Sequence, residues 1–310
     1  MTAPLRVVYM GSPAFAATIF EGVADRYEIV AAVTQPDRPA GRGQKLTPPP
    51  VKVAATARGI PVHQPTAIKT AAFREWLAAL QADVSVVAAY GRILPGPVLE
   101  TPRLGTYNVH ASLLPWGRGA APIQWAIIDG LQSTGVTIMR LDRGMDTGAI
   151  ALQRAVEIGP NDTAGSLAER LAVLGAEAMV EGLDRLARAE LPLTPQDHGA
   201  ATVARLLTKA DGRLDWAVGA HGVSCRARGV SPWPGAQARW GDLPVKLFGP
   251  TVVEGNGAPG TLLALGDHGL IVACGEGAVA FAEVQLPGRR RLPAAAVLAG
   301  QKLRVGDVLA

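Results

Sequence analysis

The chain has 310 residues, of which 48% are hydrophobic and 18% charged, and its formal net charge at pH 7 is +4. This length and composition are typical of a soluble globular protein with one large domain or two ordinary ones. The mild positive charge permits a polyanionic partner without requiring one. Two cysteines are too few for a disulfide framework or a cysteine-rich zinc site. No apolar run approaches the ~20 residues that span a bilayer.

The first half of the chain alternates short apolar runs with helical patterns, which is typical of βαβ units and a mostly parallel sheet. Strands are predicted at 5–10, 28–34, 84–89, 106–109, 135–141 and 150–158. After the first strand, Ser12 is expected to cap a helix, with Pro13 at its first position. That turn has only one of the three glycines of a dinucleotide fingerprint, which disfavours a nicotinamide or flavin cofactor. Leucines at helical spacing predict a long helix over 163–189.

The second half of the chain has a different pattern of apolar runs, prolines and glycines. Prolines and a glycine interrupt the pattern around 190–207, which is interpreted as a linker. Beyond it, short runs separated by glycines predict five strands, at 236–240, 245–253, 260–265, 270–273 and 278–286. Short strands at this spacing are typical of a small β-barrel, such as the OB type. The sequence therefore predicts an α/β domain over 1–189 and a small β domain over 208–310.

The most informative polar residues lie at the C-terminal end of the strand at 106–109. Asn108 and His110 are separated by one residue, so they lie on the same side of an extended chain. Open α/β sheets bind ligands at the C-terminal ends of their strands. A second loop supplies the carboxylate of Asp146. An amide, an imidazole and a carboxylate, without a nearby cysteine or an obvious nucleophilic serine, favour direct transfer of an acyl group to an amine.

The connection 36–50 is longer than the ~2–6 residues usual in α/β units. It carries Arg38, Arg42 and Lys45 against a single acidic residue, Asp37, and its glycines and prolines predict no regular structure. A basic, flexible arm fits the binding of phosphates. The alternative is an ordinary solvated loop. The histidines other than His110 share no metal-ligand spacing, and no metal is expected.

Several motifs occur together in one known family. They are Gly11-Ser12-Pro13-x-Phe15, the loop from Gln35 to Gly43, Asn108-x-His110, Ser112-Leu113-Leu114-Pro115, Arg118-Gly119-Ala120-Ala121-Pro122, Gly144-Met145-Asp146-Thr147-Gly148 and Pro232-Trp233-Pro234-Gly235-Ala236. From near residue 5 to the C-terminus, this combination resembles the methionyl-tRNA formyltransferase family. One departure is Trp116-Gly117, where the family usually has a basic residue followed by an aromatic one.

The resemblance implies transfer of the formyl group of 10-formyltetrahydrofolate to the α-amino group of methionyl initiator tRNA. It also implies a Rossmann-like catalytic domain and an OB-like C-terminal domain that helps to hold the tRNA. By position, Asn108, His110 and Asp146 correspond to the family's catalytic residues, which stabilise the tetrahedral intermediate and move protons. The expected substrate-binding residues are Ser112, Leu113, Leu114 and Pro115 for the folate, and Arg38, Arg42, Lys45 and Lys209 for the tRNA.

Two other functions stay open at this point. A formyl-folate enzyme that formylates a nucleotide amino sugar, or that hydrolyses formyl-folate, would share Asn108, His110 and Asp146. A non-catalytic RNA-binding protein built on the β domain would leave those residues without a role. The basic loop and the terminal β domain favour the tRNA enzyme. A strand-like segment follows the N-terminus directly, so no signal peptide is expected; we expect a cytoplasmic monomer that does not bind membranes.

Overall fold

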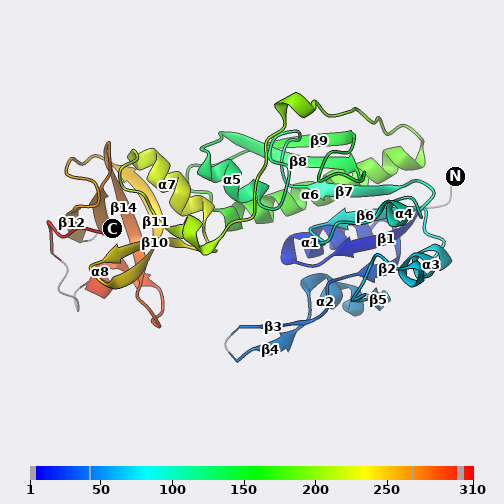
Figure 1. Cartoon of the computed structure of the whole chain (residues 1–310), viewed down its shortest axis with the longest axis horizontal. Helices are drawn as coiled ribbons and strands as arrows, with labels where there is room; N and C mark the ends of the chain where they lie inside the picture. The colour runs from blue at the N-terminus through cyan, green and yellow to red at the C-terminus, as the bar shows by residue number, and fades with distance from the viewer. Residues whose placement is uncertain (1–4, 42, 267–268, 299–303) are drawn as a thin grey trace. The chain divides into compact units, whose positions relative to one another are not determined.

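The structure, a computed structural model, describes residues 5–41, 43–266, 269–298 and 304–310. The chain divides into two units, and each contains its own sheet (Figure 1). The first unit comprises 1–119, 134–156 and 168–204, and the second comprises 120–133, 157–167 and 205–310. The domain boundaries at 189 and 208 stay a prediction. Within the described ranges, no helix is long and apolar enough to cross a membrane.

Seven strands form the sheet of the first unit. In spatial order they are β5 (Val62–His63), β2 (Glu28–Val33), β1 (Arg6–Gly11), β6 (Val84–Ala88), β7 (Thr106–His110), β8 (Ser133–Arg140) and β9 (Ile150–Glu157). The strands from β5 to β7 are parallel, whereas β8 is antiparallel to β7. The chain thus winds outward in both directions from β1, as in a Rossmann-like fold. The predicted fold class, a mostly parallel Rossmann-like sheet, is confirmed.

Helices cover both faces of this sheet, which explains why its inner strands are apolar on both sides. They are α1 (Ala14–Ala24), α2 (Pro50–Ala57), α3 (Ala71–Ala79), α4 (Gly96–Leu99) and α6 (Ala164–Ala187). Tyr9 of β1 meets the Phe20 ring of α1 edge-on, with 5.3 Å between ring centroids. Its neighbours Val8 and Met10 face the other way, into a core that includes Phe73 of α3.

The same alternation along β7 decides where its polar residues lie. Val109 faces α6, where Gly175 lets the helix come so close that a Cβ there would be 2.8 Å from the valine. Thr106 faces the opposite way and donates its hydroxyl to the carbonyl of the last residue of α4, at 2.9 Å. Period two therefore puts Asn108 and His110 on the face away from α6.

The second unit is built on an antiparallel sheet. Its strands are β10 (Ala236–Trp240), β11 (Leu243–Val253), β14 (Ala278–Gln285), β13 (Gly269–Ala273) and β12 (Leu262–Gly266) in spatial order, with β15 (Leu292–Pro293) beside β14. Its helices are α5 (Pro122–Ile128), α7 (Ala220–Gly229) and α8 (Ala294–Leu298). Leu309 pairs with Trp240 and Val308 pairs with Thr261, so one short segment joins the two edges of the sheet. This closure is that of a small barrel.

The expected N-cap at Ser12 was wrong. Helix α1 begins at Ala14, and Pro13 occupies the N-cap position. The Ser12 hydroxyl instead accepts the backbone N–H of Gln35, at 3.0 Å. The loops that follow β1 and β2 therefore bond to each other, and this contact between residues far apart in the chain takes the hydroxyl away from the helix.

The prediction of an irregular connection at 36–50 was also wrong. It contains a hairpin of β3 (Arg38–Ala40) and β4 (Lys45–Thr47), which extends away from the main sheet (Figure 1). A proline inside a strand argued against this structure. Both strands of a two-stranded ribbon are edge strands. Edge strands tolerate proline, so Pro39 does not prevent the hairpin from forming.

Candidate active site

His110 is the last residue of β7, and its imidazole is only 6% exposed. The Nε2 atom lies 2.8 Å from the carbonyl oxygen of Gly117. Because a carbonyl can only accept, Nε2 must carry a hydrogen in this contact. The other ring nitrogen, Nδ1, is therefore the atom that can gain or lose a proton.

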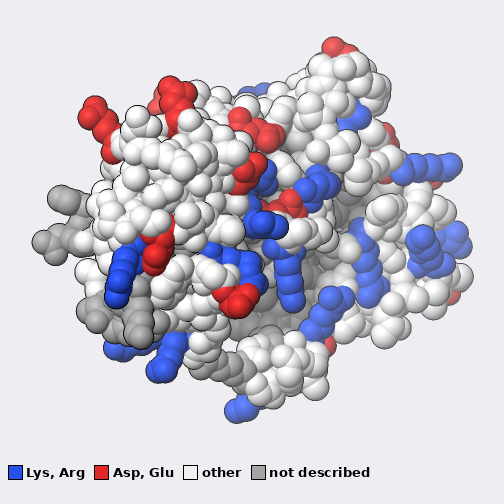
Figure 2. All heavy atoms as spheres, turned by 60° about the vertical axis from the view of Figure 1, so that its left-hand side comes forward, with Lys and Arg blue, Asp and Glu red and all other residues white. Residues whose placement is uncertain are grey.

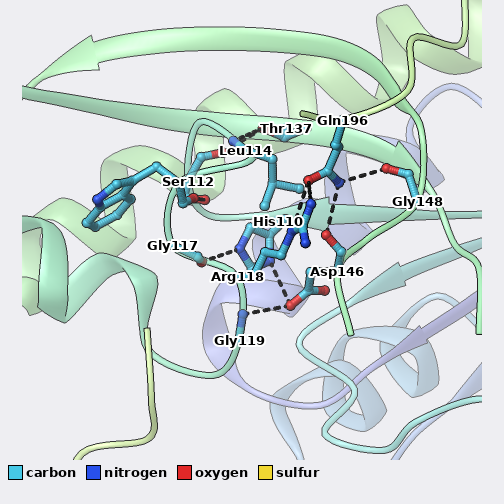
Figure 3. Close-up of polar contacts among 11 residues, drawn as sticks. His110, Ser112, Leu114, Gly117, Arg118, Gly119, Thr137, Asp146, Gly148 and Gln196 are labelled. Atoms are coloured by element: carbon cyan, nitrogen blue, oxygen red, sulfur yellow. Dashed lines mark hydrogen bonds and ion pairs between the residues drawn. The ribbon is translucent and has the colours of Figure 1, made fainter. Parts of the chain in front are cut away.

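Asp146 supplies a carboxylate directly opposite that nitrogen. Its Oδ2 atom lies 3.8 Å from Nδ1 of His110, which is within ion-pair range but beyond hydrogen-bonding distance. The same oxygen accepts the backbone N–H of Gly119, at 2.8 Å. Figure 3 shows the imidazole of His110 and the carboxylate of Asp146 facing each other beside Gly119. The structure thus brings together two residues that are separated by a whole strand in the sequence.

Asn108 lies two residues before His110 on the same face of β7 and is 9% exposed. Among the residues that the structure describes, its carboxamide has no hydrogen-bond partner. Its amide atoms are nevertheless not among the fully buried polar atoms that lack a partner in the described residues, so solvent reaches them. The donors and the acceptor of Asn108 are therefore available to a ligand.

The turn that carries Asp146 is tight. Asp146 itself has a φ of +55°, a left-handed conformation that non-glycine residues seldom adopt. At Gly148, a Cβ would overlap the carbonyl oxygen of Arg140. At Gly144, it would overlap the side chain of Thr147. Glycine on each side of the carboxylate is therefore a steric requirement of this turn.

The loop 112–115 is fixed to β8 by one hydroxyl. Thr137 donates to the carbonyl of Ser112 at 2.6 Å and accepts the N–H of Leu114 at 3.1 Å. Ser112 and Leu114 are buried, whereas Leu113 and Pro115 are partly exposed. This gives the loop a rigid backbone beside His110 (Figure 3).

Two residues at the site, Gln196 and Arg118, were given no role by the sequence reasoning, although Arg118 belongs to one of the motifs that carry the resemblance. Gln196 donates to the carbonyl oxygens of Asp146 and Gly148, at 2.9 and 2.7 Å. Its own carbonyl accepts two hydrogen bonds from the Arg118 guanidinium, at 3.1 and 2.7 Å. Both side chains are more than nine-tenths buried. No sequence signal marked Gln196, because it lies within the segment interpreted as a linker.

The basic residues expected to bind tRNA lie in both units. Arg38 and Lys45 begin the two strands of the hairpin, and both side chains are exposed. Arg42 lies outside the described residues. Lys209 belongs to the second unit, where it is the exposed first residue of the 3₁₀ turn Lys209–Gly212. Figure 2 shows one face of the molecule on which many Lys and Arg side chains are displayed.

A polar cluster fixes the base of the hairpin. Lys52 of α2 donates to both carboxylate oxygens of Asp37, at 2.9 Å each, and Gln64 donates to one of them at 2.8 Å. The hydrogen bonds from Lys52 and Gln64 lower the pKa of Asp37. The residue that precedes β3 is thus held in place even though the hairpin itself is exposed.

The family models match most of the chain. Residues 5–183 match the model described as formyl transferase, and residues 206–302 match the model of the formyl transferase C-terminal domain. The methionyl-tRNA formyltransferase of Citrifermentans bemidjiense is 47% identical, over 98% of this chain and 96% of its own. The chain belongs to the methionyl-tRNA formyltransferase family. A second relative, the methionyl-tRNA formyltransferase of Aromatoleum aromaticum, is 48% identical, over 98% of this chain and 97% of its own.

Solved structures share the fold at lower identity. HypX from Aquifex aeolicus, solved in complex with tetrahydrofolic acid, has a TM-score of 0.64 and 19% identity over 96% of this chain and 47% of its own. An N-formyltransferase from Helicobacter canadensis, in complex with folinic acid and dTDP-3-aminofucose, has a TM-score of 0.68 and 15% identity over 93% of this chain and 100% of its own. The family resemblance inferred from the motifs is confirmed, and the chain is a formyltransferase.

Proposed function

We propose that this enzyme transfers the formyl group of 10-formyltetrahydrofolate to the α-amino group of methionyl initiator tRNA. The observation that carries the proposal is the facing pair of His110 and Asp146, 3.8 Å apart at the C-terminal end of β7. Parallel sheets of this kind place their chemistry at that edge. The names of the curated relatives supply the acceptor, methionyl-tRNA, and the formyl group, and two solved structures of the same fold were determined with folates.

In the proposed reaction, the neutral amine attacks the formyl carbon and a tetrahedral intermediate forms. The attacking nitrogen loses one proton, which the carboxylate of Asp146 accepts directly or through water. The bond between the carbon and N10 of the folate then breaks as that nitrogen takes up a proton. One proton thus passes from the acceptor nitrogen to the leaving nitrogen, and no covalent enzyme intermediate is required.

The negative oxygen of the intermediate needs hydrogen-bond donors that are already in place. Asn108 offers an unpartnered N–H₂ group on the correct face of β7. His110 adds a second donor when Nδ1 is protonated, because Nε2 is occupied by Gly117. The carboxylate of Asp146 lies 3.8 Å from that nitrogen, within ion-pair range.

The substrates are proposed to bind as the motifs imply. The rigid loop of Ser112, Leu113, Leu114 and Pro115 would hold the folate beside His110. The exposed cations Arg38, Lys45 and Lys209, together with Arg42, would contact phosphates of the tRNA. No group of three or more metal-ligating side chains occurs within the described part of the chain, and the proposed steps use none.

The assay that tests this function compares three acceptors. The purified protein is incubated with formyl-folate and charged initiator tRNA, charged elongator tRNA or a nucleotide amino sugar. We expect formyl transfer to the initiator tRNA well above both others. Preferred transfer to the amino sugar would replace the proposed function by a sugar formyltransferase, and stoichiometric tRNA binding without turnover would show a binding protein.

The catalytic roles are tested by Asn108→Ala, His110→Ala and Asp146→Ala. Losing one donor that stabilises an oxyanion typically lowers kcat by about 10²–10³-fold. We expect losses of this size for each variant, with smaller changes in KM, measured as formylated tRNA per unit time. Asn161→Ala, at an exposed position in the second unit, is the control. Normal turnover in any of the three variants would remove that residue from the mechanism.

A further inference from the structure

We infer that Gln196 is a positioning residue for Asp146, an inference that rests on the proposed formyl transfer. Its carboxamide makes four hydrogen bonds, two through each end. The Nε2 atom donates to the carbonyls of Asp146 and Gly148, on either side of the turn. The Oε1 atom is held by Arg118, which fixes the direction in which the amide points (Figure 3).

The backbone at Asp146 needs such a support. Its left-handed conformation, at φ +55°, is unfavourable for a residue with a Cβ, and it persists only where neighbours hold it. Gln196 bonds the carbonyl of this residue directly, at 2.9 Å. Gln196 is 6% exposed, so water does not compete for these bonds. The direction of the Asp146 carboxylate therefore depends on the glutamine.

The three consecutive residues 117–119 complete the arrangement. The carbonyl of Gly117 accepts from His110, the guanidinium of Arg118 binds Gln196, and the N–H of Gly119 binds the carboxylate of Asp146. One short loop thus holds both reacting side chains and the residue that supports one of them. Gln196 comes from a third segment, fifty positions beyond Asp146 in the sequence.

The test begins with Gln196→Met, which keeps the size of the side chain and removes all four hydrogen bonds. A displacement of a reacting group by about 1 Å can lower the rate by about 10²-fold. We expect a fall in kcat of this order, with KM for both substrates within about threefold of the parent value. Gln196→Glu keeps the acceptor for Arg118 but has no donor for the two carbonyls, and we expect a similar loss. Gln285→Met, at a partly exposed strand position where the side chain donates one hydrogen bond to the carbonyl of Arg289, is the matched control and should keep normal kcat.

A double-mutant cycle separates positioning from general stability. In an Asp146→Asn background, Gln196→Met should lower the remaining rate by less than about threefold, because the carboxylate it aligns is already gone. A full 10²-fold loss in that background, a normal kcat in the single variant, or unfolding of both Gln196 variants would overturn the inference. A parent protein without formyl transfer would instead overturn the proposed function.

Discussion

At the scale of single residues, the turn around Asp146 leaves no space for a methyl group at Gly148. A Cβ at this position would overlap the backbone oxygen of Arg140, which cannot move without disturbing β8. Gly182 of α6 differs, because a Cβ there would lie 3.6 Å from the side chain of Ile138, an ordinary contact distance. The two glycines thus form a matched pair within one unit.

We expect Gly148→Ala to destabilise the protein by about 1–3 kcal/mol, the usual cost of overpacking. It should also lower kcat by about 10²-fold, because the turn that presents Asp146 must shift. Gly182→Ala should keep normal activity and gain about 0.5–1 kcal/mol, since alanine stabilises helix interiors. Thermal unfolding and the formylation assay measure both effects. Equal behaviour of the two variants would contradict the steric argument.

Sequence alone predicted the three proposed catalytic residues but not their support. Asn108 and His110 were proposed because they end a buried strand with period-two spacing, and all three residues because they match motifs of the family. Gln196 could not be found, because its partners are two backbone carbonyls and Arg118, and Arg118 stood in a quoted motif without a role assigned to it. A backbone carbonyl carries no sequence signature, so contacts of this kind appear only in the folded structure.

At the scale of elements, hydrophobic patterns predicted the main strands. Those strands are either buried on both faces, which gives a continuous apolar run, or buried on one face, which gives alternating apolar and polar residues. The hairpin of β3 and β4 escaped prediction for the opposite reason. Its β4 residues are all exposed, and no hydrophobic pattern marks the ribbon. Its position is instead set at its base by the hydrogen bonds of Lys52 and Gln64 to Asp37.

The 3₁₀ turn that carries Lys209 is held by one carboxylate. Asp211 accepts the backbone N–H and the hydroxyl of Thr208, at 2.7 and 2.9 Å, and forms an ion pair with Arg205. The hydrogen bond from Arg205 lowers the pKa of Asp211 well below its usual value, and the bonds from Thr208 act in the same direction. This carboxylate therefore stabilises the turn only while it is ionised.

We expect Asp211→Asn to destabilise the protein at pH 7 by about 1 kcal/mol, as for the loss of a helix cap. The folded-state pKa of Asp211 lies below the unfolded-state pKa of about 3.9. The stabilisation is therefore complete above the unfolded-state pKa and is lost as the pH falls through the folded-state pKa. The difference in unfolding temperature between parent and variant should be constant from about pH 5 to 7 and shrink below about pH 4. A difference that grows on acidification would contradict this assignment.

At the scale of the whole molecule, the cations proposed to bind tRNA are divided between the two units. Arg38 and Lys45 are exposed on the hairpin of the first unit, and Lys209 is exposed on the second. The formal charge of the chain is only +4, so general attraction to nucleic acid is modest. Binding should then depend on the particular positions of these side chains.

This division predicts how the salt dependence of tRNA binding changes with substitution. Each phosphate contact adds about 0.9 to the slope of log affinity against log salt concentration for a duplex. We expect Lys45→Ala and Lys209→Ala each to reduce the slope by about this amount, and their effects to add because the sites share no partners. Lys69→Ala removes the same charge from another exposed position and should leave the slope unchanged. Folate affinity, measured by calorimetry, should not respond to any of the three. Equal slopes for all three variants would show that net charge, not these positions, determines binding.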